Sequence, residues 1–190
     1  MNPWKLAAAF TTSLLGLYVG TKMVMGPTLA HDGSEGPGLS TVDRNSLYPP
    51  FRARFELVEA EMEALGYPLE IRGAYRDSVR QQYYFNKRYS QIDPSAGMVG
   101  MHTATSALGT PEALAVDVNW KGHNVNKEEG AYAQFFITLL AVSRKHGLTT
   151  GAAWSQRGRW AKYGIGWDPG HIEPRGFTTA QLRKGARPWV

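Results

Sequence analysis

The segment at residues 167–173, Trp-Asp-Pro-Gly-His-Ile-Glu, most constrains the fold when it is taken with His102 and Asp117. Two imidazoles and one carboxylate are a usual set of protein ligands for a hydrolytic zinc ion, which keeps its fourth position for water. The chain contains no cysteine, which excludes both a disulfide framework and a thiolate zinc site. A fold that uses this ligand set has to bring His102, Asp117 and His171 together.

Two carboxylates beside His171 are candidates for the base that a zinc-bound water needs. Asp168 lies three residues before His171, close enough to stand next to a water on the same metal, and it is our first candidate. Glu173 lies two residues after His171 and shares its face in an extended segment. We rank Glu173 second, because that position also suits a hydrogen-bonding partner of the ligand. Short motifs of this kind also arise by chance, so other segments have to support the assignment.

Residues 1–26 have the pattern of a signal peptide or membrane anchor. Lys5 precedes an uncharged stretch of 15 residues at positions 6–20, and Lys22 follows it. A membrane-spanning helix needs about 20 apolar residues, which favours a signal peptide, although residues 23–25 could lengthen a tilted anchor. We therefore expect an exported protein that faces the periplasm or the cell wall, with membrane contact through this segment if it is not cleaved.

Residues 27–42 are predicted to form a linker, because Gly, Ser and Pro are frequent and no apolar period is present. Residues 43–190 then form one domain. The formal charge is +5, and residues 144–190 hold nine Lys or Arg against two acidic residues. Such a surface favours anionic partners such as cell-wall polymers, and is equally consistent with a basic face that aids solubility. No nucleic-acid-binding motif is present, so we expect no such partner.

The first strongly periodic segment of the domain follows Pro49 and Pro50, which can open a helix, and Gly66 can end it. Its apolar residues fall at steps of four, three, four and three, at Phe51, Phe55, Val58, Met62 and Leu65. This spacing predicts a helix with one buried face.

The other segments interleave short strand patterns with helices, without the regular rhythm of a doubly wound sheet. Strands are predicted at residues 69–75, 113–120, 148–153 and 163–173. Helices are predicted at residues 78–89, 131–146 and 178–184. We expect an α+β fold with a small, mainly antiparallel sheet flanked by helices and a single zinc site.

Two of the candidate ligands lie in informative surroundings. Asp117 falls within a predicted strand between Val116 and Val118, and a charged group there needs a partner because burying it unpaired costs several kcal/mol. A metal ion is one such partner. His102 lies in a long irregular segment, residues 90–112, and loops of this length are usually functional or mobile.

Three blocks of the sequence resemble one family. Residues 70–78, followed by Gln81 or Gln82, are similar to the strand-Arg-helix segment of the zinc peptidases that cut peptidoglycan stem peptides. This LAS group contains D-alanyl-D-alanine carboxypeptidases, vancomycin-resistance D,D-peptidases and L-alanyl-D-glutamate endolysins, and the hedgehog signalling domain is a relative of the fold. Residues 100–102 stand where the family has Ser-x-His, residues 115–117 match its Ala-x-Asp, and residues 168–173 match its closing Asp-x-x-His-x-Glu. The blocks occur in the family's order.

The resemblance implies that His102, Asp117 and His171 are zinc ligands and that Asp168 is the catalytic acid and base. It further implies that Arg76 binds the substrate or its developing oxyanion, although an Arg at this position could also pair with a neighbouring acidic residue, Asp77 or Glu70. The implied activity is zinc-dependent hydrolysis of peptide bonds in peptidoglycan stem peptides, of the endolysin or D,D-carboxypeptidase type.

The alternative is a non-catalytic, zinc-containing cell-wall-binding module of the same fold. Such a module needs the three ligands but neither Asp168 nor Arg76. Both residues are present in the sequence, which favours the enzyme.

One departure from the family concerns the spacing of the first two ligands. In the family the His and the Asp are seven positions apart, whereas His102 and Asp117 are fifteen apart. Residues 106–112 could loop out while both ends stay at the metal, because longer loops cost little entropy. If His102 were displaced, His123 would be the substitute. We expect His102 to complete the site and His123 to be a loop residue.

Overall fold

The computed structural model describes residues 36–189, so the predicted export segment and residues 27–35 of the predicted linker lie outside it. Its principal helices are α1 (Pro49–Ala64), α2 (Ser78–Asn86), α3 (Glu129–Lys145) and α4 (Thr179–Arg183). Its strands are β1 (Leu69–Gly73), β2 (Val116–Trp120), β3 (Leu148–Gly151) and β4 (Asp168–Pro174). Short 3-10 helices are η1 (Arg44–Ser46), η2 (Pro94–Ala96), η3 (Met101–Thr103) and η4 (Gly158–Tyr163). Within residues 36–189, no helix has the length and apolar character needed to cross a membrane.

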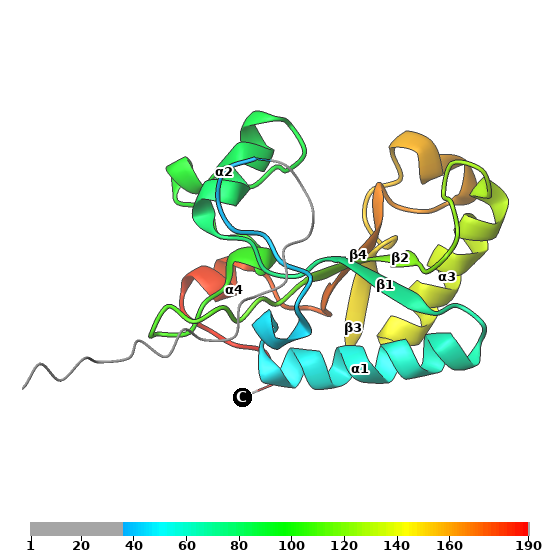
Figure 1. The fold of residues 1–190 in the computed structure, drawn as a ribbon, viewed down its shortest axis with the longest axis horizontal. Helices are drawn as coiled ribbons and strands as arrows, with labels where there is room; N and C mark the ends of the chain where they lie inside the picture. The colour runs from blue at the N-terminus through cyan, green and yellow to red at the C-terminus, as the bar shows by residue number, and fades with distance from the viewer. Residues whose placement is uncertain (1–35, 190) are drawn as a thin grey trace, which may run out of the picture.

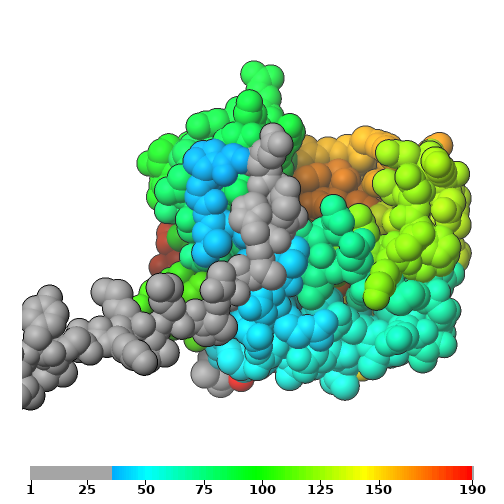
Figure 2. Space-filling view, viewed as in Figure 1, coloured from blue at the N-terminus to red at the C-terminus, as the bar shows by residue number. Residues whose placement is uncertain are grey.

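The four strands form one antiparallel sheet in the order β1-β2-β4-β3, which confirms the predicted α+β class. In Figure 1, α1 runs along one side of the molecule and α2 lies on the opposite side, with the sheet between them. In the ribbon view of Figure 1, the α2 region and the connection from β3 to β4 rise as two separate masses, which are coloured green and orange in Figure 2. The strand order places β2 and β4, which carry two of the candidate ligands, next to each other in the middle of the sheet.

The buried face of α1 follows the predicted spacing. Phe51, Phe55, Val58 and Met62 are all fully buried. Removing such side chains from water contributes about 1.5–3 kcal/mol each as an upper estimate, which explains why these positions are apolar. Leu65 is the exception and is exposed, because the helix ends at Ala64 and the chain turns away at Gly66.

The last residues of the predicted linker pack against the domain. Ser40 and Thr41 are buried. The Thr41 N–H donates to the carbonyl of Tyr75 (2.9 Å), and the Ala74 N–H donates to the carbonyl of Thr41 (2.7 Å). Residues 40 and 76 form an isolated antiparallel bridge. This segment therefore braces the backbone that carries Arg76.

The extra residues between His102 and Asp117 form a small hairpin. An isolated bridge joins Thr105 to Pro111, and the tip residue Leu108 is 94% exposed. At the base of the hairpin, the Leu114 N–H donates to the carbonyl of Met101 (2.8 Å). This hydrogen bond holds the residues that lead into β2 beside η3. The additional length thus projects into solvent and leaves η3, which carries His102, beside the sheet.

Candidate metal centre

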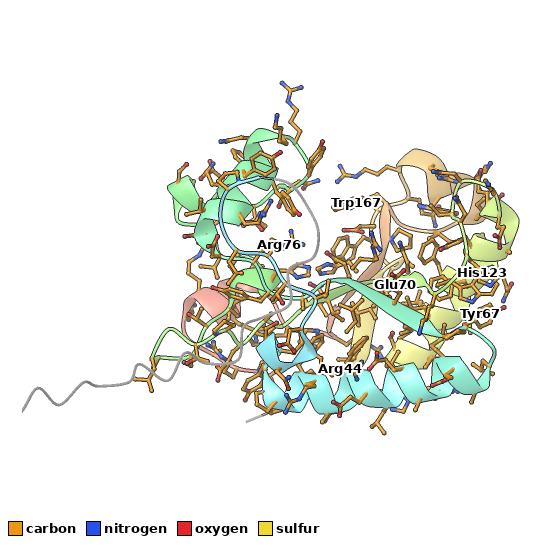
Figure 3. All side chains as sticks on the ribbon, viewed as in Figure 1. Arg44, Tyr67, Glu70, Arg76, His123 and Trp167 are labelled. Carbon is orange, nitrogen blue, oxygen red and sulfur yellow. The ribbon has the colours of Figure 1, made fainter. Side chains whose placement is uncertain are left out.

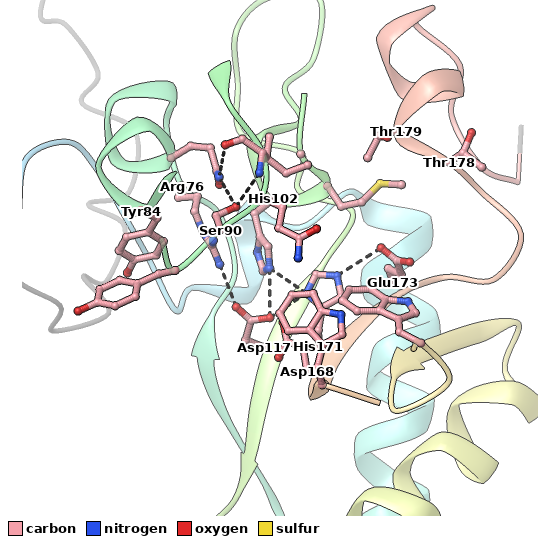
Figure 4. A pocket seen from close by; sticks show the side chains of 18 of the residues that line it. Arg76, Tyr84, Ser90, His102, Asp117, Asp168, His171, Glu173, Thr178 and Thr179 are labelled. Atoms are coloured by element: carbon pink, nitrogen blue, oxygen red, sulfur yellow. Dashed lines mark hydrogen bonds and ion pairs between the residues drawn. The ribbon is translucent and has the colours of Figure 1, made fainter. Parts of the chain in front are cut away.

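His102, Asp117 and His171 meet on one side of the sheet (Figure 4). The His102 Nε2 atom lies 3.2 Å from Asp117 Oδ1 and 3.3 Å from His171 Nδ1, and His171 Nδ1 lies 2.9 Å from Asp117 Oδ1. Asp117 on β2 is the direct ladder partner of His171 on β4, so the register of two central strands sets this pair. His102 reaches them from η3. The structure thus brings together the three residues that the sequence predicts as ligands.

The hydrogen bonds on the far sides of both imidazoles define which nitrogen carries the proton. The Nδ1 atom of His102 contacts the carbonyl oxygen of Ala74, which can only accept, so Nδ1 is the donor and Nε2 keeps its lone pair. When His171 is neutral, its Nε2 atom donates to Glu173 Oε2 (3.3 Å) and the lone pair is on Nδ1. Two nitrogen lone pairs and a carboxylate oxygen therefore face one another in a buried space.

A metal cation fits this arrangement of acceptors. Lone pairs that face each other without a donor or cation repel, and buried acceptors without a partner are costly. Ligand atoms held tetrahedrally at about 2.0–2.1 Å from a zinc ion lie roughly 3.3 Å from one another. The three separations of 2.9, 3.2 and 3.3 Å are close to that value. The His171–Glu173 contact is the kind of outer hydrogen bond that orients metal-ligating histidines.

The pKa values of the three groups are shifted by burial and by the charges and hydrogen bonds of their neighbours. Burial lowers the pKa of His102, and the charge of Arg76 lowers it further, which favours the neutral imidazole. Burial alone would raise the pKa of Asp117, but the two histidines hold it well below its usual range. Burial also lowers the pKa of His171, yet hydrogen bonds with Asp117 and Glu173 outweigh it and raise that pKa to about 10. The raised pKa of His171 shows that the carboxylates around this imidazole favour a positive charge at this place.

Arg76 pairs with Asp117 rather than with either acidic neighbour in the sequence. Its Nη2 donates to Asp117 Oδ2 (2.9 Å), and its guanidinium lies 4.9 Å from the ring centre of Tyr84. Asp77 instead caps α2, accepting from the backbone N–H of Arg80 (2.7 Å). Gly73 is the ladder partner of Asp117, and a Cβ there would come within 3.3 Å of Asp117 Oδ2. Arg76 therefore fixes the oxygen of Asp117 that faces away from the histidines.

Asp168 begins β4 and lines the same cavity as the three candidate ligands. Burial raises the pKa of Asp168, and the negative charge of Asp117 raises it further. A carboxylate whose pKa is moved towards neutrality is suited to exchanging protons. Glu173, the second candidate base, is instead engaged by His171.

The other two histidines of the described chain lie elsewhere. His123 stacks on Trp120, with 3.5 Å between ring centres, and its Nδ1 contacts Glu128 Oε2 (2.5 Å). His146 caps the end of α3 and contacts Glu61 Oε2 through Nε2 (3.0 Å). Neither side chain belongs to the group that could hold a metal.

The cavity above these residues has a volume of about 650 Å³, within the usual range for small-molecule sites. Besides the residues already described, it is lined by five aromatic side chains that the sequence did not single out as functional, namely Tyr84, Tyr89, Trp154, Trp167 and Phe177. The signal in the sequence was weak, because these residues come from three separate segments of the chain.

We expect His102→Ala to weaken metal binding and abolish metal-dependent activity, and His123→Ala to leave both close to the unaltered protein. His102 contributes a lone pair to the buried group, whereas His123 is exposed and its imidazole is held by Trp120 and Glu128. Metal content measured by mass spectrometry on the two full-length variants distinguishes them. Loss of metal from His123→Ala together with full retention in His102→Ala would reject the assignment.

No protein-family model matches the chain, and no curated protein matches it. Among solved structures, it is similar to the LdcB LD-carboxypeptidase, whose structure is described as revealing the molecular basis of peptidoglycan recognition. The identity is 16%, over 84% of this chain and 71% of that chain, with a TM-score of 0.44. It is also similar to DacB from Streptococcus pneumoniae, at 17% identity over 83% and 80% of the two chains with a TM-score of 0.40.

A second DacB structure, described as an L,D-carboxypeptidase, matches at 18% identity over 83% of this chain and 80% of that one, with a TM-score of 0.39. Likenesses at this level do not assign an activity to the chain. The function has to be argued from the site itself.

Proposed function

We propose that this protein is a zinc-dependent peptidase that hydrolyses peptide bonds in peptidoglycan stem peptides. The observation that carries the proposal is the convergence of two imidazole lone pairs and one carboxylate oxygen in a cavity that also holds Asp168 and Arg76. The resemblance of three sequence blocks to the zinc peptidases of peptidoglycan supplies the substrate class. An exported, wall-facing protein would meet that substrate.

His102, Asp117 and His171 would hold the zinc ion. When bound, zinc polarises the scissile carbonyl and lowers the pKa of a water to about 7. The chain's own residues supply the rest of the chemistry. Glu173 keeps the Nδ1 lone pair of His171 directed at the site, and Arg76 keeps Asp117 in place.

Asp168 handles the proton in this proposal. Hydrolysis adds the oxygen of water to the carbonyl carbon and breaks the bond from that carbon to nitrogen, and one proton passes from the water to the leaving amine. Asp168 accepts that proton as the water attacks and returns it to the amine as the bond breaks. Its position on the cavity wall and its raised pKa both support this role.

Arg76 has further N–H donors that can bind the substrate. A guanidinium carries five N–H donors, and the bond to Asp117 uses one of them. Since Arg76 also lines the cavity, the others can hydrogen-bond to a substrate carboxylate or to the negative oxygen that develops during attack. A module that only binds the cell wall would need neither Asp168 nor Arg76 at this place. Their presence beside the three ligands favours an enzyme.

Purified full-length protein should shorten or split stem peptides when it is incubated with isolated peptidoglycan or with soluble muropeptides. Mass spectrometry of the products identifies the bond: loss of one terminal residue indicates a carboxypeptidase, and cleavage within the stem indicates an endopeptidase. A chelator should abolish the reaction and added zinc should restore it, because the proposed reaction depends on a bound zinc ion. Zinc-loaded protein that releases no product from either substrate would refute the proposed function.

A further inference from the structure

Aromatic side chains stand on two facing walls of the cavity. Tyr84 and Tyr89 belong to the α2 side, and Trp154 and Trp167 belong to the connection between β3 and β4. Figure 3 labels Trp167 on the mass opposite the one that carries Arg76, and Figure 4 shows Tyr84 on the far side of Asp117 from Glu173. The candidate metal centre lies between these walls.

The tyrosine wall is held in a fixed shape although its outermost ring is open to solvent. Tyr89 is 72% exposed. Arg88 before it has a φ of 62°, a left-handed conformation that is uncommon for a residue with a side chain and often marks a functional site. This turn lets the Tyr89 N–H donate to the Tyr84 carbonyl (2.8 Å) and brings the two rings to 6.2 Å between centres. Gln81 then fixes the next residue, donating to Ser90 Oγ (2.7 Å).

The tryptophan wall is equally constrained. The ring centres of Trp154 and Trp167 are 5.2 Å apart, and Trp154 lies 5.1 Å from the imidazole of His171. A Cβ on Gly151 would come within 2.0 Å of the Asp168 carbonyl, and one on Gly166 within 2.1 Å of the Gly151 carbonyl. Only glycine permits this close packing, which places both indoles at the cavity.

The stem peptide does not require these aromatic walls. The bonds that the family resemblance points to join alanine to alanine or alanine to glutamate, and the side chains of these residues are a methyl group and a short chain that ends in a carboxylate. The other component of peptidoglycan is a chain of N-acetylated amino sugars. The C–H faces of a pyranose ring are apolar and slightly positive, and they pack on the electron-rich face of an aromatic ring. Ser90 and Gln91 line the cavity next to Tyr89 and offer polar groups for sugar hydroxyls and acetamides.

We infer that the cavity binds an amino-sugar ring of the glycan as well as the peptide, so that the preferred substrate is a stem peptide still attached to its sugar. The inference rests on the proposed function and names the substrate of the same site. Tyr89 and Trp167 are the residues that confer this preference.

Two substrates with the same peptide test the inference, one carrying the disaccharide and one from which an amidase has removed it. The full-length, zinc-loaded protein should give a kcat/KM ratio of at least about tenfold in favour of the sugar-bearing substrate. Tyr89→Ala and Trp167→Ala should each lower that ratio. Tyr163→Ala is the matched control, because Tyr163 is an exposed aromatic residue (38%) that does not line the cavity, and its ratio should equal that of the unaltered protein.

Binding of the free disaccharide, followed by ligand-observed NMR, provides a readout that is independent of turnover. The unaltered protein should bind it, and Tyr89→Ala should bind it more weakly. Tyr89 is largely exposed, so this variant tests the inference even if Trp167→Ala fails to fold. The inference would be overturned if kcat/KM were equal for both substrates, the disaccharide did not bind and the ratio were unchanged in Tyr89→Ala. These results would not contradict the proposed function. Failure to hydrolyse either substrate would instead refute the proposed function, and the NMR result would still decide whether the sugar binds.

Discussion

We expect Asp168→Asn to lower the turnover of stem peptides about 100- to 10,000-fold, which is the usual contribution of a general acid and base. The amide has the shape of the carboxylate but cannot take the proton of the attacking water. Asp168 is not one of the three ligand residues, so the variant should keep its full metal content. Steady-state kinetics on muropeptides and metal analysis of the same preparation measure the two effects together.

Glu173→Gln is the control for this prediction. The amide oxygen of glutamine can still accept the hydrogen bond that His171 donates to Glu173, so the imidazole keeps its orientation. Changes to such outer hydrogen bonds typically cost about 10- to 100-fold in metal affinity or activity, less than the loss of the base. If Glu173→Gln were inactive and Asp168→Asn remained active, the roles assigned to the two carboxylates would have to be exchanged.

Much of the fold could be predicted because apolar spacing encodes it directly. The stripe from Phe51 to Met62 is buried as its helical spacing required, and the apolar face of α3 contributes Phe135 and Leu139 to the same core. The antiparallel class followed from short strand patterns that lacked regular crossovers. The strand order, by contrast, depends on tertiary pairing that no local pattern specifies. That order is what makes Asp117 the neighbour of His171.

The partner of Arg76 illustrates what local sequence could not provide. Asp77 and Glu70 are acidic residues near Arg76 in the chain and were the candidate partners, but the ion pair joins Arg76 to Asp117, 41 residues later. The pairing of Gly73 with Asp117 across β1 and β2 brings the two together. Family resemblance gave Arg76 a role towards substrate, and the structure adds a contact with a candidate ligand.

The segment before Asp43 shows a different limit of composition. Gly, Ser and Pro in residues 36–42 indicated a linker, because the side chains offer no apolar face. The contacts that hold this segment are made by its backbone, through Thr41 to Ala74 and Tyr75. Backbone hydrogen bonds depend little on side-chain identity, so side-chain composition could not reveal them.

We expect His171→Ala and Asp117→Ala to lose the zinc that the unaltered full-length protein should hold at one ion per chain. Each variant removes one of three ligand atoms, and two remaining protein ligands hold zinc only weakly. Metal analysis after dialysis against a weak chelator measures the loss. Circular dichroism on the same samples checks that the fold is kept.

His171→Ala is the sharper of the two tests, because Asp117 keeps its ion pair with Arg76 when the imidazole is removed. Glu173 loses its hydrogen bond with His171, but its carboxylate is partly exposed to water (18%). Asp117→Ala, in contrast, leaves the Arg76 guanidinium without its carboxylate and is expected to lower stability as well as metal content. A folded His171→Ala protein that still holds one zinc per chain would place the metal elsewhere, and the chemistry assigned to Asp168 would then lose its basis.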